Sequence, residues 1–501
     1  MMDGRGKSDS PIVSGKPPNN TENTEEPVAE AVERRGLAKG NSLGGPTLRT
    51  QRRTGVSHAL DRVRQVARSD RKQRFTALLH HVYDVERLRA AYAALNPRAS
   101  AGIDGETWAH YGQGLEANLR DLSGRLKRGA YRAQPVRRAY IPKADGSTRG
   151  LGVPALEDKL VQRAVVEVLY AIYDTDFLGF SYGFRPGRSP HDALDALSTG
   201  LLTTKVNWVL DADIRSFFDT LEHGWLVKFI EHRVADRRVV RLIQKWLNAG
   251  VLEDGERTWS EVGTVQGGSI SPLLANLYLH YVFDLWIQRW RQTQATGDVI
   301  VVRFADDFVV GFQYRHEAER FLAELRERFA KFGLSLHPDK TRLFEFGPFA
   351  DRNRRGRGQG KPDTFNFLGF TYICGKKRSG MFTVLRQTVR QRLQAKLQAV
   401  NAELRRRMHF PIPEQGAYLR SVVAGHVRYF GVPMNGPAIS LFRREVGRLW
   451  RQVLLRRSQT HCLPWSRMKR YITRWLPPAR ICHPYPLVRL GVVTQGRSRM
   501  R

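Results

Sequence analysis

The chain has 501 residues, of which 41% are hydrophobic, enough for roughly three domains with buried cores. Its 82 Lys and Arg residues against 48 Asp and Glu residues give a formal net charge of +34 and indicate a polyanionic partner, since neutralised phosphates release counterions. The three cysteines are widely spaced and no apolar run reaches the ~18 residues of a membrane span, which argues against a zinc site, a disulfide framework and a membrane protein.

The first third of the chain predicts a polar extension, helices and one hairpin. Residues 1–55 are rich in Gly, Pro, Asn, Ser and charge, which is typical of disorder. Residues 58–98 alternate apolar and basic positions at helical spacing. A basic β-hairpin is expected within 131–160, with its turn at Asp145-Gly146, and a helix follows at 157–173.

The rest of the chain predicts short strands and then a basic helical module. Strands are expected at 207–214, 299–312 and 365–373, so the predicted fold class is α+β. After Cys374 a helix is expected at 383–408, and a second helix at 441–458 repeats its pattern. The apolar positions of these two helices are Val389, Leu393, Leu397, Val400 and Leu404, then Phe442, Val446, Leu449, Val453 and Leu454.

A hairpin with two acidic residues at its tip is the most informative stretch. VIVVRFADDFVVGF (299–312) places Asp306 and Asp307 between two apolar runs, although adjacent carboxylates repel. A divalent cation would make them favourable, because Mg²⁺ prefers carboxylate oxygens. Asp213 ends a second apolar strand in NWVLDADI, and neighbouring strands would place it beside Asp306. Taken singly, each Asp is equally well explained as a turn former.

A series of motifs accompanies these carboxylates and identifies a family. In order, the chain shows IPKADGSTRGLGVP, SYGFRPGRS, DIRSFFD, GTVQGGSISPLLANLYL, RFADDFVV, LSLHPDKT and FNFLGF. Over roughly residues 75–375, this series resembles the reverse transcriptases encoded by bacterial group II introns. The segment from YLRSVVAGHVRYFG to RICHPYP resembles the thumb, or maturase, region of the same proteins.

The resemblance implies a right-hand polymerase with an antiparallel palm sheet and an all-α thumb. The expected divisions begin with a disordered extension (1–55), N-terminal helices with fingers (56–205) and the palm (206–375). A helical thumb or maturase domain (376–458) and a short basic C-terminal segment (459–501) follow. Many relatives continue into a His-Asn-His nuclease domain. Because Cys462 and Cys482 are isolated, that domain is expected to be absent, and priming from a nascent strand at a replication fork is the hypothesis that replaces second-strand cleavage.

The resemblance also assigns roles to the acidic residues. Asp213, Asp306 and Asp307 match the catalytic triad and, with the Ile214 carbonyl, are the expected ligands of two Mg²⁺ ions, for which Mn²⁺ is a possible substitute. Such ions, about 4 Å apart, would clamp an in-line phosphoryl displacement. Lys340 in HPDKT is expected to protonate or bind the leaving pyrophosphate.

Further residues are assigned to the nucleotide and to nucleic acid. Phe218 matches the aromatic gate that excludes a 2′-hydroxyl, and Phe217 is the alternative for that role. The remaining nucleotide-binding expectations are Lys143 and Arg149 on the hairpin, and Gln266 and Gly267 in the Q-G segment. The nucleic-acid contacts expected are Arg185 and Arg188, for which a structural role is an alternative, and Arg386, Arg390 and Lys396 on the thumb.

The implied function is an RNA-directed DNA polymerase that also binds its group II intron RNA to assist splicing and mobility. Expected partners are that RNA, an RNA template/DNA primer duplex, target DNA and deoxynucleoside triphosphates, in a bacterial cytoplasm with nucleoid association. Two alternatives stay open. One is an RNA-binding splicing factor with little use of its polymerase, and the other is a domesticated reverse transcriptase in phage defence or CRISPR adaptation.

Overall fold

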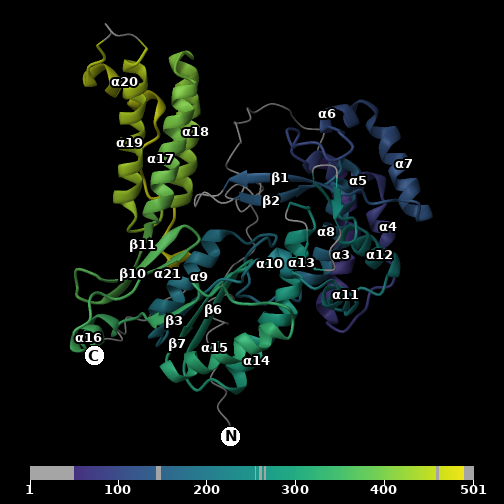
Figure 1. Cartoon of the computed structure of the whole chain (residues 1–501), viewed down its shortest axis with the longest axis horizontal. Coiled ribbons are helices and arrows are strands. Elements are labelled where there is room, and N and C mark those ends of the chain that lie inside the picture. Colours follow the sequence, from purple (N-terminus) through teal and green to yellow (C-terminus); the bar gives the residue numbers. More distant parts are fainter. Residues whose placement is uncertain are drawn as a thin grey trace.

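The computed structural model describes residues 50–142, 148–253, 256–258, 262–264, 267–457 and 462–489. These residues form a mixed α/β fold with three β-sheets (Figure 1), which confirms the predicted mixture of helices and strands. The predicted extension 1–55 lies mostly outside the described residues, and helix α3 already begins at Thr50. None of the helices in the described ranges is both long and apolar enough to cross a membrane.

The N-terminal helices gather around α8 (Leu156–Tyr173), which is contacted by α3, α4 and α5. Helix α8 is buried along most of its length, because apolar residues occupy nearly every face. Helix α7 ends at Gly129, whose φ of 76° suits glycine at a helix C-terminus. The bounds are α3 Thr50–Ser69, α4 Leu79–Val82, α5 Val85–Ala94, α6 Trp108–Tyr111, η1 Gly112–Gly114 and α7 Leu115–Arg128.

The predicted basic hairpin is confirmed. Strands β1 (Val136–Pro142) and β2 (Thr148–Val153) pair antiparallel, while the turn at 143–147 lies outside the described residues. Strand β4 (Val251–Glu253) adds to β1 in parallel, and β5 (Glu256–Thr258) completes a sheet of order β2-β1-β4-β5. The hairpin is therefore anchored to the segment that follows helix α12 (Arg237–Leu247).

A four-stranded sheet of order β6-β7-β3-β8 lies at the centre of the fold. Its strands are β3 Trp208–Ala212, β6 Val299–Phe304, β7 Asp307–Phe312 and β8 Arg342–Glu345. Val301 and Val310 face one hydrophobic core, whereas Val302 and Val309 face another. Burial on both faces explains why the two apolar runs of the predicted hairpin are uninterrupted.

Helices cover both faces of this sheet. Helix α9 (Pro190–Thr203) packs on β6 from one side, and its N-terminus carries a capping box made by Ser189 and Asp192. The other face belongs to the larger core, which includes residues of α13, α14 and α15. The bounds of the remaining helices here are α10 Phe217–Thr220, α11 His223–Glu231, α12 Arg237–Leu247, α13 Ser271–Leu279, the π-helical η2 His280–Asp284, α14 Leu285–Thr293, α15 Arg315–Ala330 and α16 Ala350–Gly356.

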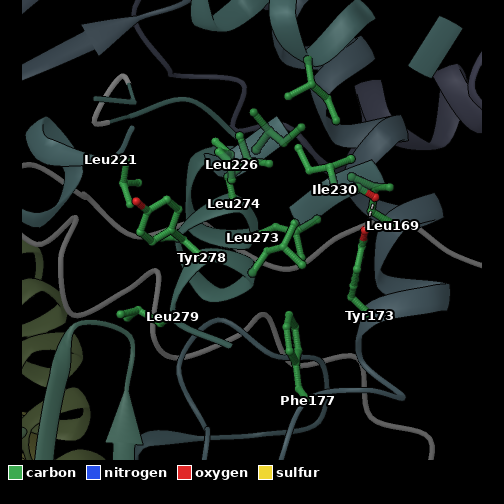
Figure 2. Packing of buried hydrophobic residues seen from close by; sticks show 14 of the residues in the cluster. Leu169, Tyr173, Phe177, Leu221, Leu226, Ile230, Leu273, Leu274, Tyr278 and Leu279 are labelled. Atoms are coloured by element: carbon green, nitrogen blue, oxygen red, sulfur yellow. Dashed lines mark hydrogen bonds between the residues drawn. The ribbon is translucent and has the colours of Figure 1, made fainter. Parts of the chain in front are cut away.

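The larger core joins the N-terminal helices to the sheet layer. Figure 2 shows side chains of α8, α11 and α13 packed together, with Tyr173 and Ile230 side by side. The Tyr173 hydroxyl donates a 2.8 Å hydrogen bond to the Ile230 carbonyl, so this buried polar group is satisfied. One continuous core therefore fixes the N-terminal helices against the central sheet.

The strand prediction around 365–373 is confirmed, but the segment contains two strands, and the helix expected from residue 383 begins later. Strands β9 (Phe365–Phe367) and β10 (Phe370–Lys376) form a hairpin, because Leu368 and Gly369 take φ of 47° and 84° and reverse the chain. The helix expected from residue 383 is preceded by β11 (Phe382–Thr388), which pairs antiparallel with β10. The β-branched residues in FTVLRQT favour this strand.

The last helices form a bundle with its own core (Figure 1, yellow-green). In Figure 1 the bundle stands beside β10 and β11, away from α3–α7. Most of the predicted apolar face residues are buried in this core, and Leu397 and Leu449 pack at its edge. The bounds are α17 Arg390–Arg406, α18 Ile412–Phe430, α19 Gly436–Leu455 and α20 Trp465–Trp475. The short helix α21 (Pro486–Arg489) contacts α9 instead of this core.

Candidate active site

The register of the central sheet brings the predicted carboxylates to one end of it. Strands β3 and β7 pair antiparallel with Ala212 opposite Phe308, so the next position places Asp213 opposite Asp307. Strands β6 and β7 form a tight hairpin in which Phe304 pairs with Asp307, leaving Ala305 and Asp306 as its turn. Acidic residues about ninety positions apart in the sequence therefore meet at the same edge.

Asp211 is an acidic residue of this site that sequence reasoning missed. It lies two positions before Asp213 on β3, so both side chains are on the same face of the sheet. Arg342 Nη2 lies 3.6 Å from its Oδ2 atom. Desolvation raises the pKa of Asp211 to about 6, with Arg342 opposing the rise and Asp213 adding to it. The alternation in Asp-Ala-Asp was the available signal.

Desolvation and neighbouring negative charge raise the pKa values of two of these carboxyl groups, Asp211 and Asp307. Asp307 is an exposed residue, yet the atoms around its carboxyl group desolvate that group. This desolvation, followed by the charges of Asp306, Asp213 and Asp211, raises the pKa of Asp307 to about 7, and Arg392 opposes the rise. A divalent cation would relieve such repulsion.

The oxygen atoms at this edge of the sheet are of the chemical type that binds a magnesium ion. Carboxylate and carbonyl oxygens are the ligands that Mg²⁺ prefers. Ile214 forms an isolated antiparallel bridge with Leu336 that uses the Asp213 carbonyl and the Arg215 amide, so the Ile214 carbonyl is not part of this pairing. Within the described residues, however, no three His, Cys, Asp or Glu side chains are already grouped as a metal site.

Lys340 makes a direct contact with one of the carboxylates. Its Nζ atom donates a 2.8 Å hydrogen bond to Oδ2 of Asp213. The backbone holds the same segment in place, because the His337 amide donates to the Asp213 carbonyl at 2.8 Å. The HPDKT motif is thus fastened to the end of β3, and Lys340 lies beside one of the predicted carboxylates.

The two phenylalanines considered for the sugar gate have different environments. Phe217 is buried, whereas Phe218 is half-buried at the edge of the core, and their rings meet edge to face with centroids 5.6 Å apart. The Phe218 carbonyl accepts a 2.6 Å hydrogen bond from the Thr264 amide, which ties it to the Q-G segment. Phe218 is therefore the phenylalanine of the pair that keeps an accessible side.

The residues predicted to bind the triphosphate are described only in part. Lys143 and Gln266 lie outside the described residues. Arg149 belongs to β2, where it pairs with Ile141 of β1. Gly267 has a φ of 112°, and a Cβ there would lie 2.6 Å from the Gly152 carbonyl oxygen. Glycine is needed at 267 because the Q-G segment runs directly against β2.

Arg185 and Arg386 require a correction, because both are buried and used inside the protein. Arg185 pairs with Asp174 at 2.8 Å and donates to the carbonyls of Leu178 and Ser181. Arg386 is on strand β11 and pairs with Asp195 at 2.7 Å. Neither guanidinium is presented to a nucleic acid, so the structural alternative holds for Arg185.

The other predicted nucleic-acid contacts are more accessible. Arg188 is half-buried, with its guanidinium 5.3 Å from the centre of the Tyr182 ring. Arg390 is exposed in the first turn of α17, and Lys396 is half-buried one and a half turns further along. Arg392 lies beside them, within electrostatic reach of Asp307. The start of α17 thus brings positive charge close to the carboxylates.

Comparison with known proteins agrees with this geometry. Residues 141–372 match the family model described as "Reverse transcriptase (RNA-dependent DNA polymerase)". Protein YkfC of Escherichia coli is 33% identical over 352 residues, which cover 64% of this chain and 88% of that protein. The group II intron-encoded protein LtrA of Lactococcus lactis is 35% identical over 222 residues, covering 44% of this chain but only 37% of LtrA. A protein from the cob intron of Schizosaccharomyces pombe is 41% identical over 155 residues, covering 31% of this chain and 19% of that protein.

Proposed function

This chain belongs to the family of reverse transcriptases encoded by group II introns, and from that premise we propose that it extends DNA primers on an RNA template at the β3–β7 edge. The observation that carries the proposal is the register that sets Asp213 opposite Asp307 next to the Ala305-Asp306 turn. The proposed right-hand divisions are fingers at 56–205, palm at 206–375 and thumb at 376–458.

In this proposal, Asp213 and Asp306 are the principal Mg²⁺ ligands, with Asp307 and the Ile214 carbonyl completing the oxygen set. The metal would supply charge neutralisation for the transferred phosphoryl group and lower the pKa of the primer 3′-hydroxyl. Lys340 would pass from Asp213 to the pyrophosphate as charge develops there, acting as proton donor or cationic partner. Its contact with Asp213 supports this role, because it already lies at the reaction centre.

Substrate choice would rest on Phe218. An aromatic ring beneath the sugar leaves no room for a 2′-hydroxyl, so the proposed substrates are deoxynucleoside triphosphates. Its half-buried position beside the fully buried Phe217 supports this assignment. Gly267 would let the backbone approach the nucleotide and β2 closely, and the β1–β2 hairpin would cover the triphosphate.

A second activity, binding of a folded intron RNA, is proposed for the C-terminal helices. Helix α20 has an exposed basic face and no acidic residue: Arg467, Lys469, Arg470 and Arg474. In Figure 1, α20 lies at the end of the bundle away from β10 and β11. A basic surface at that distance has no part in the catalytic edge, so it favours a further phosphate backbone as its ligand.

Primer extension by the purified chain tests the proposal. The wild-type protein should extend a DNA primer on an RNA template with deoxynucleotides and Mg²⁺. Asp306→Ala should abolish extension while RNA affinity changes by less than about twofold, because removal of one carboxylate leaves the phosphate contacts intact. Extension that persists in Asp306→Ala would refute the assignment of the catalytic carboxylates.

A further inference from the structure

A charged side chain is fully buried directly beneath the catalytic turn. Arg303 is the next-to-last residue of β6, inside the apolar run VIVVRF, and it is 0% exposed. A buried guanidinium is costly unless its charge and its hydrogen bonds are satisfied. Its partners therefore indicate what this position contributes.

Four groups from separate parts of the chain satisfy Arg303. Asp284 accepts from Nε at 2.7 Å and also forms an ion pair with Nη2. Asn276 Oδ1 accepts from Nη1 at 3.0 Å, and Ser181 Oγ accepts from Nη2 at 2.7 Å. The fourth is the Ala305 carbonyl, which accepts from Nη1 at 2.9 Å. Arg303 thus joins helix α13, the π-helical turn η2 and the SYGFRPGRS segment to the turn that carries Asp306.

The turn that is held in this way is strained. Ala305 has a φ of 58°, a left-handed conformation that is unfavourable for a residue with a Cβ. Such a conformation persists when surrounding contacts determine it, and the Arg303 hydrogen bond to the Ala305 carbonyl is one such contact. The π-helical stretch His280–Asp284 ends on the carboxylate that pairs with Arg303.

The SYGFRPGRS segment braces the same turn through its backbone. The Tyr182 amide donates to the Arg303 carbonyl at 2.8 Å, and the Arg303 amide donates to the Phe180 carbonyl at 2.9 Å. A Cβ on Gly183 would lie 2.3 Å from the Ala305 amide nitrogen. The Asn276 side chain, already bound to Arg303, donates to the Gly183 carbonyl at 2.7 Å. The two segments are in backbone contact, and there is no room for a side chain between them.

We propose that Arg303, with Asp284, Asn276 and Ser181, is a positioning assembly that fixes the Ala305-Asp306 turn for metal binding, and that Gly183 allows the close contact. Arg303 acts through the turn and touches no substrate. The inference rests on the proposed function, because it assigns the metal-binding role to Asp306 and Asp307. It also gives the SYGFRPGRS motif a role, namely to brace the catalytic hairpin.

Arg303→Lys tests the assembly, because lysine keeps the charge opposite Asp284 but cannot reach all four acceptors from one nitrogen. Arg386→Lys is the matched control, since Arg386 also forms a buried ion pair, 2.7 Å from Asp195, away from the turn. Both variants should lower the melting temperature. Arg303→Lys alone should weaken Mn²⁺ binding, followed by electron paramagnetic resonance, and lower kcat by about tenfold each, the usual effect of losing a partner that orients metal ligands.

Gly183→Ala gives a second test that leaves every charge in place. It should displace Ala305 and weaken Mn²⁺ binding in the same direction as Arg303→Lys. Gly200→Ala is its control, because a Cβ there would meet the flexible end of Ile300 rather than the turn. The KM for deoxynucleotides should change less than kcat in both test variants, since the nucleotide contacts are elsewhere.

The outcomes separate this inference from the proposed function. If Arg303→Lys and Gly183→Ala keep the Mn²⁺ affinity and kcat of the wild type, the inference is overturned. The proposed function still stands in that case, provided that the wild-type protein extends primers. A wild-type chain that binds Mn²⁺ but extends no primer would remove the proposed function. The Mn²⁺ comparison between test and control variants would then still support or overturn the positioning role.

Discussion

Nζ of Lys340 lies 2.8 Å from Oδ2 of Asp213, and this contact joins a loop before β8 to the end of β3. The lysine side chain is 62% exposed, so the pair contributes only about 0–1 kcal/mol to stability. Its proposed importance is chemical, because the cation lies beside Asp213, a proposed metal ligand.

Lys340→Gln should therefore separate metal binding from catalysis. Loss of the cation that competes for Asp213 should lower the Mg²⁺ concentration needed for half-maximal thermal stabilisation. At the same time, kcat for primer extension should fall by about 100-fold, the scale of a lost proton donor. Lys376→Gln is the control, because Lys376 is equally exposed and pairs with Asp351 at 3.3 Å. Equal effects in both variants would show that Lys340 has no special role.

The raised pKa of Asp307 predicts how stability depends on pH when metal is chelated. A carboxyl group whose pKa is higher in the folded than in the unfolded state binds its proton more tightly when folded. Its stabilising contribution is complete below the unfolded pKa of about 3.9 and is lost as pH rises through the folded value. For Asp307 the folded value is about 7.

Asp307→Asn measures this contribution by difference. The free energy of unfolding of the variant should decline less than that of the wild type between about pH 4 and 7, because its amide does not titrate. Added Mg²⁺ should remove the wild-type decline near pH 7. If the free energy of unfolding depends on pH in the same way for both proteins in chelator, the raised pKa of Asp307 is contradicted.

The two neighbouring phenylalanines should respond differently to truncation. Phe218→Ala should admit ribonucleotides, measured as a fall in the ratio of kcat/KM for deoxynucleotides over ribonucleotides. Phe217→Ala should instead destabilise the fold by roughly 3–5 kcal/mol, because Phe217 is buried in the core, and should leave the ratio unchanged. An unchanged ratio in Phe218→Ala would move the gate to another residue.

The exposed Arg390 and the buried Arg386 provide a matched pair that tests nucleic-acid binding by the proposed thumb. Arg390→Ala should weaken binding of an RNA/DNA duplex for every sequence and reduce the salt slope by about one, as expected for one lost phosphate contact. Arg386→Ala should lower thermal stability, since Asp195 would be left buried without this partner. An equal fall of the salt slope in the two variants would contradict the assignment of Arg390 to nucleic-acid binding and of Arg386 to the protein interior.

Much of the fold was predictable because local patterns and the tertiary structure agree. The apolar faces of α17 and α19 and the Asp145-Gly146 signal for the β1–β2 hairpin lead to the observed elements. The split of 365–373 into two strands was missed because it depends on two consecutive left-handed residues, one of which is Leu368. A leucine gives no sign in the sequence of that conformation.

The carboxylates of the candidate site were predictable from the sequence, whereas the residues that position them were not. Asp213, Asp306 and Asp307 stand out because acidic residues at the ends of apolar strands need an explanation. Arg386 was placed on a helical surface because its neighbours are basic, and only the pairing of β11 with β10 reveals that it is buried. Arg303 was visible as a charge in an apolar strand, but its partners come from segments up to 122 residues away.

We propose that Asp213 and the carboxylates of the β6–β7 turn hold metal ions together. Counting the Mn²⁺ ions bound by the chain with a chain-terminated primer, an RNA template and the next deoxynucleotide tests this directly. The wild type should bind about two ions, and Asp213→Asn and Asp306→Asn should each bind fewer. A wild-type chain that binds none, or variants that bind the wild-type number, would contradict it.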